Sequence, residues 1–165
     1  MRLALVLLTL LSCHTAIAQA PLPSLPERPS EESVQRDAAT LFRAIVADDP
    51  SIAEALFFPR EAFTQVKAMV KPERYWERLH ARFLRDIHAL HESSPNLASA
   101  TFVQLALGRR GGWVSPGEEG NKLGYWAARH ALLHYRVGSE ERTLEVRVLI
   151  TWQGRWYVIH LSEFH

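Results

Sequence analysis

Apolar residues recur with two different periods along this chain, and the change of period separates a helical first part from a strand-forming second part. Between residues 31 and 92 they return every three or four positions, as on one face of an α-helix. From Ser99 onward they alternate with polar residues, as in half-buried strands. The sequence therefore predicts an α+β domain over residues 31–165, with N-terminal helices packed on a curved, cone-like antiparallel sheet of about four strands.

Two helical segments carry a well-defined apolar stripe. The first stripe comprises Val34, Ala38, Leu41, Phe42 and Ile45. The second lies in residues 73–92, after Pro72, and comprises Trp76, Leu79, Phe83, Ile87 and Leu90. Proline is favoured at the first position of a helix, which supports a helix beginning there. Shorter helical segments are predicted over residues 52–58 and 61–69.

The second part of the chain predicts strands over residues 101–107, 123–137, 142–152 and 155–162. Short turns join the last three, so neighbouring strands must run antiparallel. Residues 108–121, which contain five of the eight glycines and also Trp113, are predicted to form a loop. This loop lacks the lysine and Ser/Thr pattern of a phosphate-binding loop.

Turn positions determine which residues face each other across these hairpins. A two-residue turn at Gln153-Gly154 predicts four pairs, namely Trp152–Arg155, Ile150–Tyr157, Val148–Ile159 and Val146–Leu161. A two-residue turn at Ser139-Glu140 predicts Tyr135–Leu144, Leu133–Val146 and Ala131–Val148. With both turns the aliphatic residues share one side of the sheet, where we expect the helices to pack.

The opposite side of the predicted sheet collects titratable residues. One cross-strand row contains His134, Glu145 and Ser162, the next contains Leu132, Arg147 and His160, and His130 lies one row further. Such a face is either a site for a ligand or acid/base chemistry, or a solvated surface on which these groups pair with one another. The candidate ligand-binding residues are Trp113, His130, His134, Glu145, Arg147 and His160.

A divalent metal bound by His130, His134 and His160 is a further hypothesis, but their spacing matches no diagnostic ligand pattern. We therefore predict no metal and no other cofactor. The catalytic candidate is Asp86, which falls inside the apolar stripe of residues 73–92. Desolvation there would raise its pKa and suit it to act as a general base. The alternative is an aspartate bonded to a loop amide or to an arginine.

The first residues have the three parts of an export signal: Arg2, an apolar run from Leu3 to Leu11, and small residues after it. Ala16-Ile17-Ala18 allows cleavage after residue 18 and release of a soluble chain. Leu10-Leu11-Ser12-Cys13 resembles a bacterial lipobox, which would end the leader at residue 12 and place a lipid on Cys13. The protein is thus expected to be exported, periplasmic or extracellular, with a lipid anchor as the alternative.

Residues 19–30 form a proline-rich linker, with prolines at 21, 23, 26 and 29. Cys13 is the only cysteine, so the exported chain has no intramolecular disulfide. The formal charge of +1 becomes 0 when Arg2 is removed with the leader (1 − 1). A neutral domain offers no electrostatic basis for binding nucleic acid or anionic lipid, so contact with a membrane is expected only through Cys13.

The order of helices and strands, together with the closing segment ITWQGRWYVIHL, resembles the nuclear transport factor 2-like, ketosteroid-isomerase-like cone fold. The resemblance covers Glu31 to His165, and such domains often end in a hairpin of the form W-x-G-x-W-Y-V. It implies a pocket between the helices and the concave side of the sheet, used for hydrophobic ligands, for isomerase or dehydratase chemistry, or as a dimer or peptide surface. The chain is also similar to uncharacterised exported bacterial proteins with single domains of this type.

Two functions follow as hypotheses. The first is non-catalytic binding of a small apolar ligand or a protein partner, with a homodimer compatible with either, and it predicts an apolar cavity without converging titratable groups. The second is an isomerase, dehydratase or hydrolase in which Asp86 acts from the pocket. No set of catalytic residues from an enzymatic branch of the resembled family aligns with this chain.

Overall fold

Helices precede the sheet, as predicted. The computed structural model describes residues 25–162. The predicted leader with Cys13 and both cleavage sites, and the linker up to residue 24, lie outside the described residues. The helices are α1 (Glu31–Ala47), α2 (Arg60–Val66) and α3 (Pro72–Ser93), with short 3-10 helices η1 (Pro50–Leu56) and η2 (Leu97–Ser99). The strands are β1 (Ala100–Ala106), β2 (Gly111–Val114), β3 (Tyr125–Val137), β4 (Glu140–Trp152) and β5 (Arg155–His160).

The two long helices begin and end where local chemistry favours it. The hydroxyl of Ser30 accepts a hydrogen bond from the backbone N–H of Ser33 at 3.3 Å and so caps α1. Asp48 adopts a left-handed conformation, with φ 54°, at the other end. Helix α3 starts at Pro72 and buries Leu79, Phe83 and Ile87 of its predicted stripe.

Among the described residues, no helix has both the length and the apolar character needed to cross a membrane.

The sheet is antiparallel and contains five strands rather than about four. Its order is β1-β3-β4-β5, and β2 also pairs with β3, alongside the part that β1 leaves uncovered. Strand β2 lies in the segment that was predicted to be a loop. A Cβ atom on Gly111 would lie 2.2 Å from the carbonyl oxygen of Ala127, so the glycine allows β2 to approach β3 closely. The absence of a side chain at Gly111 therefore permits β2 to pair with β3.

The last hairpin confirms two of its four predicted pairs, and Val146–Leu161 is not among the pairs observed. Gln153 and Gly154 both have positive φ, 49° and 76°, as the expected two-residue turn requires, and Trp152–Arg155 and Ile150–Tyr157 are paired. The prediction for Val148 is wrong, because it pairs with His160 while Leu149 pairs with Val158. Ile159 is thus the extra residue of a β-bulge. Beyond a bulge the alternation of faces is reset.

The hairpin between β3 and β4 turns at Gly138-Ser139, one residue earlier than predicted. Gly138 has φ 60°, which suits the first central position of a type II′ turn. Val137 therefore pairs with Glu140, and Ala131 with Val146, a register shift of two residues from the prediction. A shift of two leaves every side chain on its predicted face. The predicted rows change, however, because His134 lies opposite Thr143 and Leu132 opposite Glu145.

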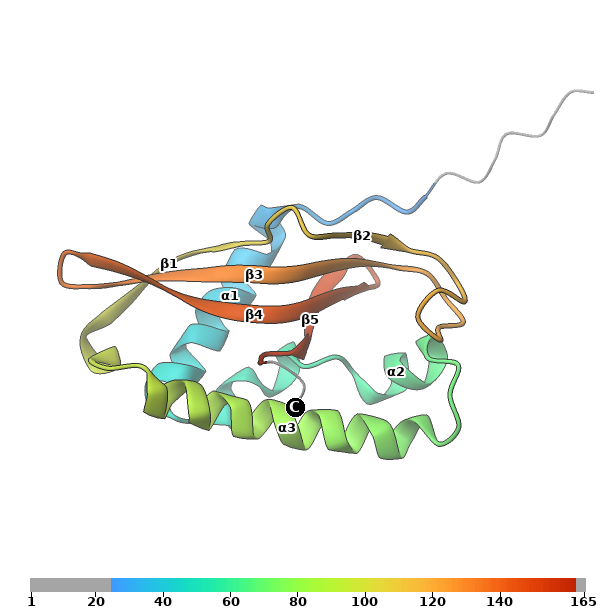
Figure 1. Ribbon diagram of the computed structural model, residues 1–165, viewed down its shortest axis with the longest axis horizontal. Helices are drawn as coiled ribbons and strands as arrows, with labels where there is room; N and C mark the ends of the chain where they lie inside the picture. The colour runs from blue at the N-terminus through green and yellow to red at the C-terminus, as the bar shows by residue number, and fades with distance from the viewer. Residues whose placement is uncertain (1–24, 163–165) are drawn as a thin grey trace, which may run out of the picture.

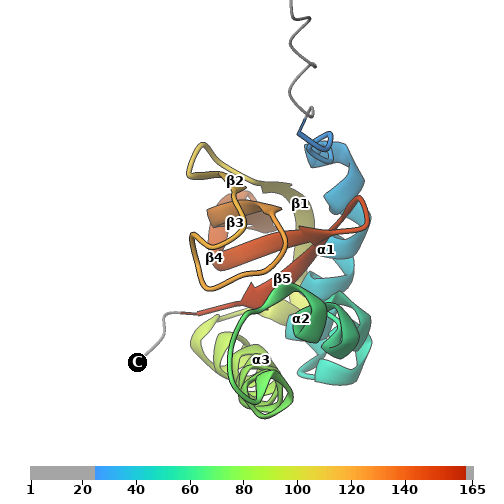
Figure 2. The same cartoon turned by 90° about the vertical axis from the view of Figure 1, so that its right-hand side faces the viewer.

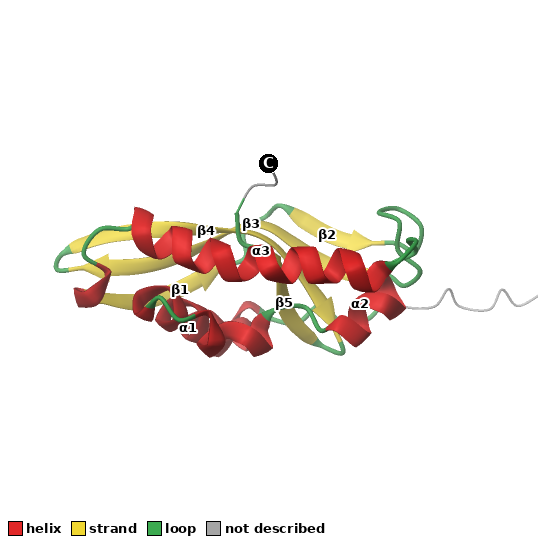
Figure 3. Cartoon of the chain, turned by 90° about the horizontal axis from the view of Figure 1, so that it is seen from below, coloured by secondary structure: helices red, strands yellow, loops and turns green. Residues whose placement is uncertain are grey.

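Helices cover the sheet from below and from one flank (Figures 1 and 2). Seen from below, α3 runs the length of the strands (Figure 3). On the α1 side, the ring of Phe42 lies 5.4 Å from that of Tyr135 and 6.2 Å from that of Phe102. Between α2 and β5, the ring of Phe58 lies 5.8 Å from that of Tyr157. The space between β3–β5 and helices α2 and α3 contains the site described next.

Candidate functional site

A pocket of about 130 Å³ lies between the sheet and helices α2 and α3. One part of its wall is apolar or aromatic and consists of Phe63, Tyr75, Leu79, Val148, Ile150 and Ile159. The other part carries polar or ionisable groups, which are Lys67, Glu119, Tyr125, Arg129 and His160. The cavity is thus amphipathic, whereas the binding hypothesis predicts an apolar cavity without converging titratable groups.

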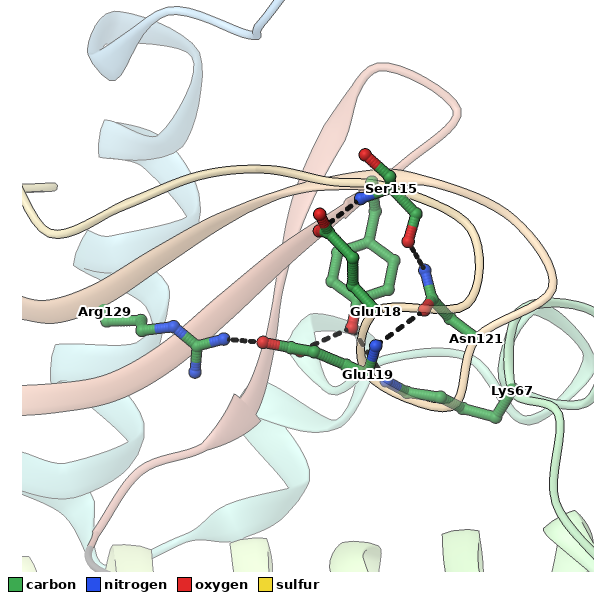
Figure 4. A network of polar contacts seen from close by, with 7 residues as sticks. Lys67, Ser115, Glu118, Glu119, Asn121 and Arg129 are labelled. Carbon is green, nitrogen blue, oxygen red and sulfur yellow. Dashed lines mark hydrogen bonds and ion pairs between the residues drawn. The ribbon is translucent and has the colours of Figure 1, made fainter.

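The polar residues form a chain of hydrogen bonds (Figure 4). Nζ of Lys67 donates to the hydroxyl of Tyr125 at 2.8 Å, and that hydroxyl donates to Oε2 of Glu119, also at 2.8 Å. The other oxygen of Glu119 forms an ion pair with Arg129. A continuous path for a proton therefore joins an ammonium group, a phenol and a carboxylate.

The loop between β2 and β3 positions Glu119. Asn121 is 2% exposed, and its side-chain oxygen accepts from the backbone N–H of Glu119 at 3.0 Å. Its amide nitrogen donates to the carbonyl oxygens of Ser115 and Leu123 at 3.0 and 2.9 Å. The backbone of the loop also bonds the end of α2, where the N–H of Lys122 donates to Val66 at 2.6 Å. Lys67 and Glu119 are therefore brought together by the backbone contact between α2 and this loop.

Burial alters the acid–base properties of three groups in the pocket. It lowers the pKa of Lys67, although the nearby charge of Glu119 opposes the change. It raises the pKa of Tyr125, which the hydrogen bond to Glu119 raises further. It also lowers the pKa of His160, with a contribution from the positive charge of Arg82. His160 is therefore predominantly neutral at pH 7.

The structure places His160 in this pocket, which corrects the prediction that it lies on the open face with Arg147 and Leu132. The bulge at Ile159 pairs His160 with Val148, and both residues line the pocket. His130 and His134 contact glutamates on the open face instead. The three histidines of the hypothetical metal site therefore do not come together. No group of three or more His, Cys, Asp or Glu side chains within residues 25–162 is arranged to hold a metal ion.

The open face instead holds two separate clusters. Nδ1 of His130 contacts Oε1 of Glu145 at 2.7 Å, and Arg147 donates to the same oxygen at 3.1 Å. Partial burial raises the pKa of Glu145, but the hydrogen bonds from Arg147 and His130 outweigh it and hold the value below its ordinary level. His130 has φ 56° and lies where β3 passes from its β1 partner to its β2 partner. This arrangement matches the interpretation of a paired surface.

The second cluster joins His134 to Glu141, with 2.9 Å between Nδ1 and Oε1. Trp113 lies on β2, where its ring meets that of Trp126 edge to face at 5.5 Å. The Trp113 ring covers Gly124, because a Cβ atom there would lie 2.2 Å from Cζ2 of Trp113. Trp113 therefore packs against the sheet in this structure.

Asp86 contacts the end of β5 from α3. Its Oδ2 accepts from the backbone N–H of Ser162 at 3.2 Å and from the Ser162 hydroxyl at 2.8 Å. Arg82 lies 3.9 Å from the same oxygen. Asp86 is not among the residues that line the pocket, although its charge acts on His160. Its proposed role as a general base remains a prediction.

Of the polar residues that line the pocket, only His160 was a sequence candidate, and Lys67, Glu119, Tyr125 and Arg129 were not. Arg129 did carry a signal, because it shares the parity of Ala131 and Leu133 on the predicted helix-facing side of β3, where a charged residue is unusual. Lys67 and Glu119 carried no such signal, since neither lies in a segment with strong periodicity.

A scan against models of protein families, a search of curated proteins and a search of solved structures each found no match to this chain.

Proposed function

We propose that the domain binds a small carboxylic acid with an apolar body in the pocket between the sheet and helices α2 and α3. The observation that carries the proposal is the position of Lys67, which is half-buried and lines the same cavity as Phe63, Leu79 and Ile159. An ammonium group has three N–H donors, and Tyr125 accepts one of them. The other donors suit the oxygens of a carboxylate.

The charge at the polar end favours an anion. Lys67 and Arg129 are cations, and Glu119 is the one carboxylate among the pocket-lining residues. Partial desolvation strengthens the attraction between an ammonium group and a bound anion, because the effective dielectric constant is lower than in water. The attraction of a bound anion also compensates for part of the hydration that Lys67 loses on burial.

The size of the cavity limits the ligand to about one ring. An apolar cavity of about 150 Å³ accommodates benzene, and this pocket has about 130 Å³. The ligand class is therefore a monocyclic or branched-chain carboxylate. The resemblance to nuclear transport factor 2-like domains supports this location, since members of that superfamily use the space between helices and sheet as a pocket.

The test is titration of the protein at pH 7 with benzoate, benzamide and benzene, followed by calorimetry or NMR. We expect benzoate to bind most tightly, and Lys67→Met to weaken benzoate by roughly 10- to 100-fold, since a charge-assisted hydrogen bond contributes about 1.5–3 kcal/mol. Lys71→Met is the control, because the side chain of Lys71 is exposed and does not line the pocket. Equal binding of benzoate and benzamide, unaffected by Lys67→Met, would exclude recognition of an anion. Absence of binding by all three would exclude a pocket of this class.

A second candidate function is proton transfer on a ligand held in the pocket. The observation that favours it is the unbroken path from Lys67 through Tyr125 to Glu119. Neutral Lys67 would take a proton from a carbon next to a carbonyl group, leaving the electron pair on the resulting enolate. Exchange of such hydrogens in D₂O, followed by NMR with phenylacetone, tests this function. Exchange that persists in Lys67→Met would contradict it.

A further inference from the structure

Residues 25–30, the last part of the linker, are attached to the sheet by two tryptophans. Nε1 of Trp126 donates to the carbonyl oxygen of Pro26 at 2.9 Å. Nε1 of Trp156 donates to the carbonyl oxygen of Pro29 at 3.1 Å. The guanidinium of Arg28, between these two prolines, lies 5.5 Å from the centre of a Trp156 ring. In Figure 1 this segment runs along the sheet, past β2, into α1.

The donor and acceptor groups match for a chemical reason. A proline has a backbone carbonyl but no N–H, so a proline-rich segment offers mainly acceptors. The indole of tryptophan is a donor only. A segment in the polyproline II conformation makes no internal hydrogen bonds, so its carbonyls are free for such donors. The two indoles thus complement the part of a proline-rich chain that has no partner of its own.

The spacing of the two contacts supports the same conformation. Polyproline II has about three residues per turn, so carbonyls three positions apart point in the same direction. Pro26 and Pro29 have this separation, and both carbonyls meet an indole of the same sheet. The sequence places Pro23 another three positions earlier, which gives a P-x-x-P-x-x-P pattern. Grooves lined by aromatic side chains recognise segments of this kind.

We propose that Trp126 and Trp156 form a docking site for extended P-x-x-P segments, and that the proline-rich segment ending at residue 30 of the same chain is its occupant. The linker is then bound to the sheet and is not a free spacer. Its residues 25–30 hold a defined position on the sheet. This site is separate from the pocket, since neither tryptophan lines that cavity.

The first test uses the full exported chain and the indole N–H signals in its NMR spectrum. We expect the signals of Trp126 and Trp156 to exchange slowly with solvent. Replacing Pro23, Pro26 and Pro29 with glycine keeps the carbonyls but removes the preformed conformation, so both signals should shift and exchange at least several-fold faster. The Trp152 signal is the control for a local effect. Trp76, which donates to Phe58 at 2.6 Å, reports whether the fold is intact.

The second test adds a synthetic peptide of residues 19–30 to the triple-glycine variant. We expect the Trp126 and Trp156 signals to return toward their native positions, in proportion to bound peptide. A peptide of the same composition with adjacent prolines should have no such effect. The native chain should respond only at far higher peptide concentration, because its own segment has an effective concentration near the millimolar range.

Two results would overturn the proposal. The first is a triple-glycine variant in which the Trp126 and Trp156 signals remain protected and unshifted. The second is a folded variant that shows no change at these signals with millimolar peptide. If the triple variant is unfolded, Trp126→Phe in the native chain replaces it, because this change keeps the aromatic ring and removes the donor. The amide of Arg28 must then become more mobile than in the matched Trp152→Phe variant, and unchanged mobility would contradict docking.

Discussion

Lys67 and Tyr125 are 58 positions apart in the chain, yet Nζ of Lys67 donates to the Tyr125 hydroxyl at 2.8 Å. Lys67 follows directly after α2, and Tyr125 is the first residue of β3. The pair joins a helix to the sheet at the polar end of the pocket. Because the Tyr125 hydroxyl also donates a hydrogen bond to Glu119, removal of this hydroxyl affects two charged groups.

Tyr125→Phe is therefore expected to lower the free energy of unfolding by roughly 1–3 kcal/mol, since it leaves Lys67 and Glu119 without their shared partner. Urea denaturation measures the change. Tyr75→Phe is the matched control, because Tyr75 contributes a ring stacked 5.9 Å from Phe63 and its substitution is expected to cost less than about 0.5 kcal/mol. Equal losses in the two variants would show that the hydroxyl of Tyr125 contributes nothing particular.

His160 is expected to make the stability depend on pH below its ordinary pKa of 6.5. Burial and the charge of Arg82 lower its pKa in the folded protein, so the unfolded chain binds the proton more readily. Stability should therefore be lost as the pH falls from 6.5 toward the lower folded value. The positive charges of Lys67 and Arg129 also lower the pKa of His160, while the negative charge of Asp86 raises it.

This dependence is measured as the difference between the native protein and His160→Gln in chemical denaturation from pH 7.5 to 4.5. The variant should lose the His160 part of the slope. His134→Gln, which removes a histidine from the open face, should retain it. If both variants followed the native curve, His160 would not be the group responsible.

Gly124→Ala is expected to destabilise the protein by roughly 1–3 kcal/mol through overpacking. The added methyl would lie 2.2 Å from Cζ2 of Trp113, so the indole has to move off the sheet. In a Trp113→Leu background the same change should cost much less, since the outer ring is gone. A double-mutant cycle from thermal or urea unfolding gives the coupling. Additive effects of the two substitutions would contradict the close contact.

Asp86→Ala should reduce the free energy of unfolding by roughly 1–2 kcal/mol, because Ser162 loses the acceptor of two hydrogen bonds. Asp86→Asn keeps one side-chain oxygen as an acceptor and should cost less. Binding of benzoate is expected to stay within twofold in both variants, since Asp86 does not line the pocket. A large loss of binding with unchanged stability would instead favour a direct role for Asp86 in the site.

The helical part illustrates what a local pattern can predict. The stripe of Leu79, Phe83 and Ile87 follows from spacing alone, and all three side chains are buried in the structure. The turn at Gln153-Gly154 was likewise readable, since its length and its glycine select the hairpin. Both features depend on residues within a few positions of one another.

Local patterns of this kind did not predict the pocket. The single extra residue Ile159 moves His160 from the predicted open face into the pocket. Gly111 and its neighbours, which suggested a loop, pair with β3 because that edge is left uncovered by β1. Among the charged residues of the pocket, Arg129 was the one whose position on the inner face of a predicted strand was detectable.

Local sequence patterns suffice to predict the division into helices and strands, the buried stripes and the side of the sheet that the helices cover. These properties arise from repeat distances of the backbone, which every local segment carries. The meeting of Lys67, Glu119 and Tyr125 is visible only in the folded chain, and so are the contacts of Trp126 and Trp156 with the linker. Such contacts depend on bulges and loop packing that bring distant segments together, and no periodicity within a single segment encodes them.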